Sequence, residues 1–245
     1  MLVNIFPNIY MCSMTISFLI YILYFILNLR KTNVPLWHLC LSGIFILLVS
    51  ILGGRLMWAI ENISYITVND IFSLRFGNWR LVGVFIFNII SILLVTYIYY
   101  KYYNVSISQT LTIVLEAVFL EFALNKLCCF LEGCCYGVET TLPWGMIFDN
   151  SGIHRHPTQL YEFISFSTIF ILLRLTRNKF NISIKFSFAT TLYIITRLLV
   201  EPIREEANVY SQGPTKYIYY ILLFICIVII LTNILCKLQH FKSSK

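Results

Sequence analysis

The stretch from Leu36 to Ile60, LWHLCLSGIFILLVSILGGRLMWAI, decides the fold. It contains one arginine, Arg55, and neither a lysine nor an acidic residue. About 20 consecutive apolar residues are enough for an α-helix to cross the hydrocarbon core of a bilayer. Because a backbone in lipid must satisfy its hydrogen bonds internally, this stretch predicts a membrane-spanning helix.

The composition extends this prediction to the whole chain. Of the 245 residues, 59% are hydrophobic and 12% are charged, whereas a soluble domain is about one quarter charged. No linker separates a second domain, so we expect residues 1–245 to form a single integral membrane domain. The fold class predicted is all-α, a polytopic membrane protein with seven transmembrane helices. They are expected at Tyr10–Leu29, Leu36–Ile60, Trp79–Tyr100, Ser108–Leu131, Gln159–Leu175, Phe186–Val200 and Tyr217–Cys236.

The charges predict the orientation of these helices. Cytoplasmic loops of membrane proteins carry an excess of basic residues, and Arg30 and Lys31 follow the first predicted helix, which no basic residue precedes. With the N-terminus outside and the C-terminus inside, ten of the eighteen basic residues and none of the eleven acidic residues lie on the inner side. The net charge of +7 therefore reports topology and contact with membrane lipids, and we expect no nucleic acid partner.

Two polar stretches lie at the predicted outer ends of helices: Arg155–Glu162 (RHPTQLYE) and Thr196–Arg204 (TRLLVEPIR). Ionisable groups at membrane depth are unfavourable, so they mark functional sites. Arg197, Glu201 and Arg204 share one helix face if the helix continues through the proline between the last two. Because guanidinium groups bind phosphate in a bidentate manner, this face predicts a site for a phospholipid headgroup. The alternative is a structural ion-pair triad, since structural networks also gather charge.

Glu116 and Glu121 lie inside the fourth predicted helix, where a carboxylate is unfavourable. We expect them to be protonated, or paired with Lys126 or an arginine. Arg177 lies in a predicted inner loop, and its replacement is expected to leave lipid binding unchanged.

Four cysteines, Cys128, Cys129, Cys134 and Cys135, form a cluster at the end of the same helix. They are interpreted as inert packing residues, as a disulfide or redox pair, or as a metal site whose spacing is not that of a standard zinc knuckle. The outer side is oxidising, and a turn at Gly133 would bring Cys129 and Cys134, or Cys128 and Cys135, within the Cα separation of about 7 Å that a disulfide needs. We favour at least one disulfide and expect no metal and no cofactor.

Several motifs resemble those of the prolipoprotein diacylglyceryl transferase family. Pro143–Phe148 (PWGMIF) followed by Arg155–Glu162 resembles the central block of that family. Thr196–Arg204 contains its Arg-x-x-x-Glu-x-x-Arg segment, and Gly53–Leu56 (GGRL) is similar to its Gly-Ala-Arg-Leu. The resemblance extends from about Leu36 to Lys237, which is most of the chain.

This resemblance implies an enzyme of the bacterial cell membrane with seven spans. Such enzymes transfer a diacylglyceryl group from phosphatidylglycerol to the lipobox cysteine of a preprolipoprotein at the outer face of the membrane. The acceptor thiolate displaces glycerol phosphate, and a thioether forms. Arginines hold the lipid phosphate and a base helps to deprotonate the thiol, because the thiolate is the nucleophile and the leaving group carries charge.

The candidate site residues follow from the resemblance and from the polar stretches together. Arg197 and Arg204 are expected to hold the phosphate, Glu201 to orient them, and His156 or Tyr161 to act as the base. The substrate-binding candidates are Lys126, Arg55, Arg155, Gln159, Glu162 and Asn78.

The signature of the family differs in this chain. Asn125–Gly137 (NKLCCFLEGCCYG) stands where the family has Gly-Arg-x-Gly-Asn-Phe-x-Asn-x-Glu-x-x-Gly, so Lys126 replaces an arginine. Asn78 matches a family histidine that is a candidate base. Two alternatives therefore stay open beside the ordinary transferase. One is a diverged membrane protein that binds lipid or uses the cysteine cluster for thiol redox chemistry, and the other is a transferase with a different acceptor.

Overall fold

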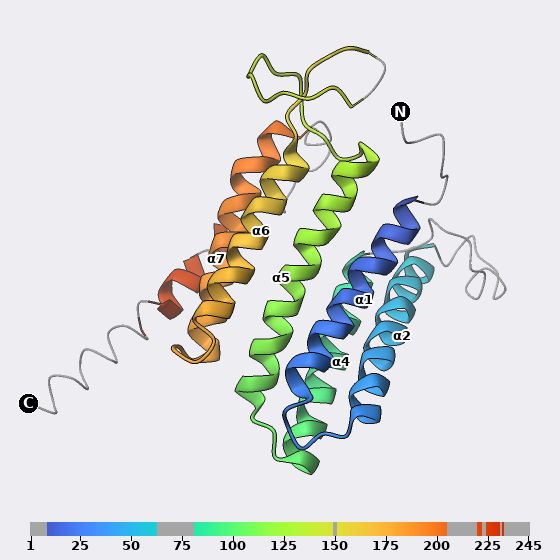
Figure 1. Ribbon diagram of the computed structural model, residues 1–245, viewed down its shortest axis with the longest axis vertical. Helices are drawn as coiled ribbons and strands as arrows, with labels where there is room; N and C mark the ends of the chain where they lie inside the picture. The colour runs from blue at the N-terminus through green and yellow to red at the C-terminus, as the bar shows by residue number, and fades with distance from the viewer. Residues whose placement is uncertain are drawn as a thin grey trace, which may run out of the picture. The chain divides into compact units, whose positions relative to one another are not determined.

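The computed structural model describes residues 9–62, 81–148, 151–204, 220–221, 224–230 and 232. Within these ranges the chain is helical and contains no β-strand, which confirms the all-α prediction (Figure 1). The helices are α1 (Ile9–Leu29), α2 (Leu36–Glu61), α4 (Leu81–Tyr103), α5 (Ile107–Glu132), α6 (Thr158–Leu175) and α7 (Ile182–Val200), followed by the 3₁₀ helix η1 (Glu201–Ile203).

Six of the seven predicted helices are confirmed, and the described residues of the seventh, within 220–232, are helical. The start of α7 is the main difference: it begins at Ile182 rather than at Phe186. The added turn contains Lys185, whose ammonium group donates to the carbonyl of Arg177 at 2.7 Å. A buried lysine can join the helix there because a backbone acceptor satisfies it.

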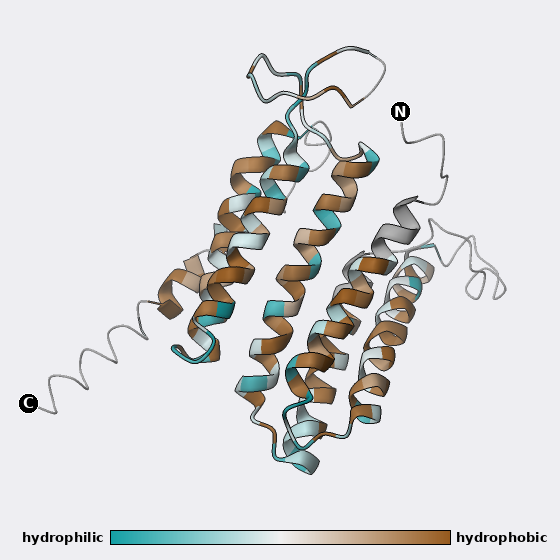
Figure 2. Cartoon of the chain, in the orientation of Figure 1, coloured by the Kyte–Doolittle hydropathy of each residue, from teal (hydrophilic) through white to brown (hydrophobic). Residues whose placement is uncertain are grey.

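Many large apolar side chains on these helices face outward. Leu19 of α1 and Leu48 of α2 are each 58% exposed, and hydrophobic residues predominate along the helices in Figure 2. Leu36–Ile60, Ile86–Tyr103 and Ile182–Ile203 are long and apolar enough to cross a membrane. An outward apolar surface of this extent fits contact with lipid chains, as expected of a membrane protein.

The chain divides into two compact units, of which the second is Ile22–Val114. In this unit α2 packs against α4 through polar and small residues. Tyr99 donates to the hydroxyl of Ser42 at 2.6 Å, and the side-chain amide of Asn88 donates to the hydroxyl of Ser50 at 2.9 Å. Side-chain hydrogen bonds of this kind hold helices together in lipid, where burial of apolar surface supplies little driving force between helices.

The first unit, Met1–Tyr21 with Leu115–Lys245, contains the predicted site residues apart from Arg55 and Asn78. Here α6 and α7 lie side by side (Figure 1). A buried cluster joins α5, α6 and α7, with the rings of Phe166 and Tyr193 stacked at 5.8 Å. This packing fixes the three helices that carry the charged residues of the site.

Glu116 of α5 is fully buried and is paired with arginine, as predicted. Arg177, after α6, donates from Nε to the carboxylate at 2.8 Å and from its terminal nitrogen to the other oxygen. Arg174 adds a longer contact at 3.9 Å. Arg177 therefore ties the turn between α6 and α7 to α5, and the expectation that its replacement leaves lipid binding unchanged stays a prediction.

Candidate active site

The loop between α5 and α6 lies beyond the ends of both helices (Figure 1). Backbone hydrogen bonds close it on itself and on the segment after α7. The amide of Gly137 donates to the carbonyl of His156 at 2.8 Å, and the amide of Val138 donates to the carbonyl of Ile203 at 2.8 Å. Residues far apart in the sequence are thereby joined at the start of α6.

Gly137 occupies the point where these segments meet. A Cβ atom there would lie 2.8 Å from Cβ of His156 and 2.9 Å from Cγ2 of Thr158, and it would collide with the carbonyl oxygen of Ile203. The backbone of Gly137 also forms an isolated bridge with Arg204. Glycine is required here because the backbone of Ile203 and the side chains of His156 and Thr158 leave no space for a Cβ atom.

A chain of ion pairs runs through the site and is centred on Glu162 of α6, which is 1% exposed. One carboxylate oxygen of Glu162 lies 2.6 Å from Nζ of Lys126, and the other lies 2.7 Å from a terminal nitrogen of Arg197. The second terminal nitrogen of Arg197 pairs with Glu201. The structure thus brings together side chains of α5, α6, α7 and η1, and two cations balance two anions.

Arg204 does not share a helix face with Arg197 and Glu201, because the condition for it, a helix that continues through Pro202, is not met. Helix α7 ends at Val200, Pro202 lies in η1, and Arg204 has an extended backbone with φ −77° and ψ 141°. Proline lacks the amide that a continuing helix needs. Arg204 is held instead by the loop, next to Gly137 as described above.

Nε of Arg197 and Oε1 of Gln159 are buried and have no hydrogen-bond partner among the described residues, and Oε2 of Glu162 is likewise buried with only its ion pair to Lys126. The amide nitrogen of Gln159 does have a partner, the carbonyl of Cys134. Nearly all buried polar groups in proteins are hydrogen-bonded, so this donor and this acceptor are candidates for contacts to a bound polar group.

His156 and Tyr161 form a pair rather than two separate bases. The indole nitrogen of Trp144 donates to the hydroxyl of Tyr161 at 2.9 Å, and that hydroxyl lies 3.2 Å from Nδ1 of His156. Because the tyrosine oxygen accepts from the indole, its own proton can point to Nδ1 of a neutral imidazole. Sequence reasoning did not assign Trp144 to this pair, although the PWGMIF motif contains it.

The remaining predicted residues are Arg155, Arg55 and Asn78. The guanidinium of Arg155 stacks 5.0 Å from the ring centre of Tyr136, a cation–π contact in the loop. Arg55 is buried in α2, in the other unit, so its part in the site stays a prediction. Asn78 lies outside the described residues.

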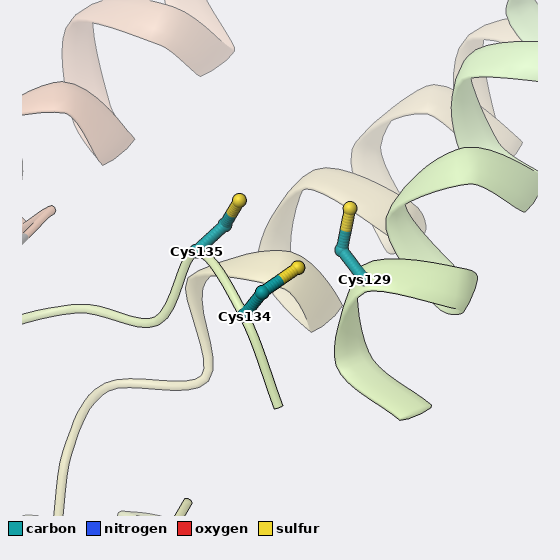
Figure 3. Close-up of side chains that lie close together, drawn as sticks. All are labelled: Cys129, Cys134 and Cys135. Carbon is teal, nitrogen blue, oxygen red and sulfur yellow. The ribbon is translucent and has the colours of Figure 1, made fainter. Parts of the chain in front are cut away.

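Three of the four clustered cysteines converge. The sulfurs of Cys129, at the end of α5, and of Cys134 and Cys135, in the following loop, all lie within 4.8 Å of one another (Figure 3). The sulfur of Cys128 lies 3.8 Å from the hydroxyl of Ser17. All four are free thiols, so the predicted disulfide stays a prediction.

Charge and hydrogen bonding favour a thiolate at Cys135. Hydrogen bonds from Cys129 and Cys134 lower the pKa of the Cys135 thiol, and the positive charges of Lys126 and Arg204 lower this pKa further. Lys126 also pairs with Glu162, so its charge acts on both the thiols and the ion-pair chain.

Comparison with known proteins assigns the chain to a family. The family model described as prolipoprotein diacylglyceryl transferase matches residues 2–236. Three similar relatives all carry the name phosphatidylglycerol–prolipoprotein diacylglyceryl transferase. The relative from Clostridium tetani (strain Massachusetts / E88) is 33% identical over 190 residues, which cover 74% of this chain and 75% of the relative. The relative from Finegoldia magna (strain ATCC 29328 / DSM 20472 / WAL 2508) is 30% identical over 202 residues, with coverage of 80% and 78%. The relative from Clostridioides difficile (strain 630) is 32% identical over 163 residues, with coverage of 65% and 63%. The chain belongs to the prolipoprotein diacylglyceryl transferase family.

Proposed function

We infer that this membrane protein transfers a diacylglyceryl group from phosphatidylglycerol to the cysteine of a prolipoprotein. The main structural support is the position of Glu162. This residue is 1% exposed and pairs with Lys126 through one carboxylate oxygen and with Arg197 through the other. A buried carboxylate that fixes two cations from two different helices preorganises positive charge before a substrate binds.

Arg197 is the proposed contact to the lipid phosphate. Its terminal nitrogens are engaged by Glu162 and Glu201, and its buried Nε has no partner among the described residues. An N–H in that position can donate to a phosphate oxygen without breaking either ion pair. The leaving glycerol phosphate gains charge in the transition state, and one preorganised donor of this kind typically contributes a factor of about 10²–10³ in rate.

The thiol is deprotonated by the His156–Tyr161 pair in this proposal. Tyr161 passes its hydroxyl proton to Nδ1 of His156 and receives the proton of the acceptor thiol, over the 3.2 Å contact described above. The acceptor sulfur then attacks the diacylglyceryl carbon that bears the phosphate. The C–S bond forms as the C–O bond breaks, and the electron pair leaves with glycerol phosphate.

The site is proposed to open at the outer face of a bacterial cell membrane, in a chain with seven spans, the N-terminus outside and the C-terminus inside. The support is the charge distribution. Arg177 and Lys185, at the end of α6 and the start of α7, lie at the opposite end of these helices from Glu162 and Glu201. Basic residues are enriched on the cytoplasmic side, so the Glu162 end faces outward.

A transfer assay with defined lipids tests this function. Full-length protein is reconstituted in vesicles that contain either phosphatidylglycerol or phosphatidylethanolamine, with a lipobox peptide that carries cysteine or serine. Mass spectrometry should find the diacylglyceryl thioether only with phosphatidylglycerol and the cysteine peptide. Equal transfer from phosphatidylglycerol and phosphatidylethanolamine, or modification of the serine peptide, would contradict the proposed substrates.

A further inference from the structure

The three convergent thiols, Cys129, Cys134 and Cys135, are not used by the transfer described above. They come from two segments: Cys129 from the end of α5, and the other two from the loop (Figure 3). Their sulfurs lie within 4.8 Å of one another, while neighbouring Cys128 contacts Ser17. The turn at Gly133 brings the two segments together, with the amide of Cys134 donating to the carbonyl of Cys129 at 3.1 Å.

The backbone of the loop is held in the conformation that makes them meet. Gly133 has φ +67° and Cys135 has φ +60°, which is uncommon for a residue other than glycine. The carbonyl of Cys135 accepts from the hydroxyl of Thr158 at 2.7 Å, and the carbonyl of Cys134 accepts from Gln159. Both donors are fully buried. Backbone strain that the surroundings enforce in this way is found at functional sites.

Three thiolates form a donor set for a thiophilic metal ion. With zinc–sulfur bonds of about 2.3 Å in a tetrahedron, the sulfurs would lie about 3.8 Å apart, so the thiols need to close by only about 1 Å. Three thiolates and one Zn²⁺ carry a net charge of −1, which suits the positive charges of Lys126 and Arg204 beside Cys135. A disulfide would use two of the sulfurs and leave the third without a role.

We propose that Cys129, Cys134 and Cys135 bind Zn²⁺ as thiolates, and that the fourth position of the metal takes the sulfur of the acceptor cysteine. The second part rests on the proposed transferase function. Sites with three protein ligands and one open position are those in which zinc binds a reactant. A thiol that coordinates zinc is deprotonated outright, so the metal lowers the demand on the His156–Tyr161 pair.

The transfer step remains balanced with the metal present. The acceptor thiol loses its proton through Tyr161 to His156 as its sulfur binds Zn²⁺. This sulfur then forms the C–S bond while the C–O bond to phosphate breaks, and zinc keeps its oxidation state. The thioether product is neutral and binds the metal more weakly than a thiolate, which favours its release.

The metal site is tested on the full-length protein in detergent micelles, without any need for activity. Zinc content is measured by mass spectrometry of the metal, and Co²⁺ is titrated to follow cobalt–thiolate absorption. We expect about one metal ion per chain in the parent and in Cys128→Ser, the matched control. Cys134→Ser should bind at least roughly tenfold more weakly, since changes even outside the ligand shell cost about 10–100-fold. Circular dichroism confirms that both variants are folded.

Three results would overturn the site. They are a parent protein that takes up neither Zn²⁺ nor Co²⁺, equal loss of metal in Cys128→Ser and Cys134→Ser, and a disulfide among the three thiols in the protein isolated under air. If Cys134→Ser unfolds, Cys135→Ser replaces it in the same comparison.

The open position is tested with the lipobox peptide. The cysteine peptide should change the absorption of the Co²⁺ protein, and the serine peptide should not. A parent that transfers diacylglyceryl without bound metal overturns this inference and leaves the function standing. Metal binding and a spectral response without any transfer leave the site standing and remove the function. Full transfer by a metal-free Cys134→Ser variant overturns the role of the fourth position.

Discussion

The substitution Glu162→Gln probes the ion-pair chain most sharply, because glutamine keeps the size of the side chain and removes its charge. Glu162 is 1% exposed and faces two cations, Lys126 at 2.6 Å and Arg197 at 2.7 Å. Removing one partner of a buried ion pair costs about 3–5 kcal/mol. The two cations keep 19% and 15% of their side chains exposed, so water reaches them. We therefore expect the lower end, about 3 kcal/mol.

The loss of stability is measured by thermal unfolding of the full-length protein in micelles, followed by circular dichroism. For a chain of this length, about 3 kcal/mol corresponds to a fall in Tm of roughly 6–12 °C. Glu139→Gln makes the same chemical change at an exposed position of the loop and is the matched control. Its effect should stay within about 0.5 kcal/mol.

The double variant Lys126→Met/Glu162→Gln separates the ion pair from the rest of the effect. Residues that interact directly are non-additive by about 0.5–3 kcal/mol, so the double variant should lose less stability than the two single variants together. Additive losses, or a Glu162→Gln protein as stable as the parent, would refute the argument that Glu162 holds the two cations in place.

Three further predictions concern the topology of the chain, the position of Gly137 and the ion pair of Glu116. Reporter fusions at Lys101 should read cytoplasmic and fusions near Asn150 external, and the reverse pattern would place the site at the wrong face. Gly137→Ala should abolish transfer and lower Tm, because its Cβ would lie 2.8 Å from the side chain of His156. Normal activity and an unchanged Tm would show that the segments around Gly137 can move apart to admit a side chain. Arg177→Ala leaves fully buried Glu116 without its main partner and should cost about 3–5 kcal/mol, largely restored by adding Glu116→Gln. If Glu116→Gln restores no stability to Arg177→Ala, the ion pair between these residues contributes little to the free energy of unfolding.

The helices could be predicted from the sequence because each apolar run must satisfy its own backbone in lipid. The run from Leu36 to Ile60 corresponds to α2, Leu36–Glu61, almost residue for residue. The start of α7 could not be predicted by hydropathy, since the hydrogen bond from Lys185 to a distant carbonyl makes the polar turn acceptable.

The composition of the site could be predicted in part. The motifs contained Glu162, Arg197 and Lys126, but their pairing joins residues 35 or more positions apart. Sequence spacing reports which residues share a helix face and not which helices pack together. The position of Arg204 stayed open in the sequence, because it depends on whether the helix continues past Pro202, and the structure shows that it does not.

The division within the cysteine cluster, by contrast, was open to prediction. Cys128 and Cys129 are neighbours at the end of α5, and successive residues on a helix point about 100° apart. Only one of them can face the loop, and the structure selects Cys129. The approach of Cys134 and Cys135 to Cys129 could not be predicted from the sequence, because it depends on the positive φ of Cys135.

The most direct test of the central claim is lipidation in a bacterial strain depleted of its own transferase. The claim is that this chain transfers diacylglyceryl and that Arg197 holds the lipid phosphate. The parent chain should restore the diacylglyceryl thioether on a reporter lipoprotein, measured by mass spectrometry. Arg197→Ala, at the same level in the membrane, should not, while Arg197→Lys should restore part of it because lysine keeps the charge and loses the fork. A parent that is present in the membrane and lipidates nothing, or an Arg197→Ala variant that lipidates as the parent does, would contradict the account.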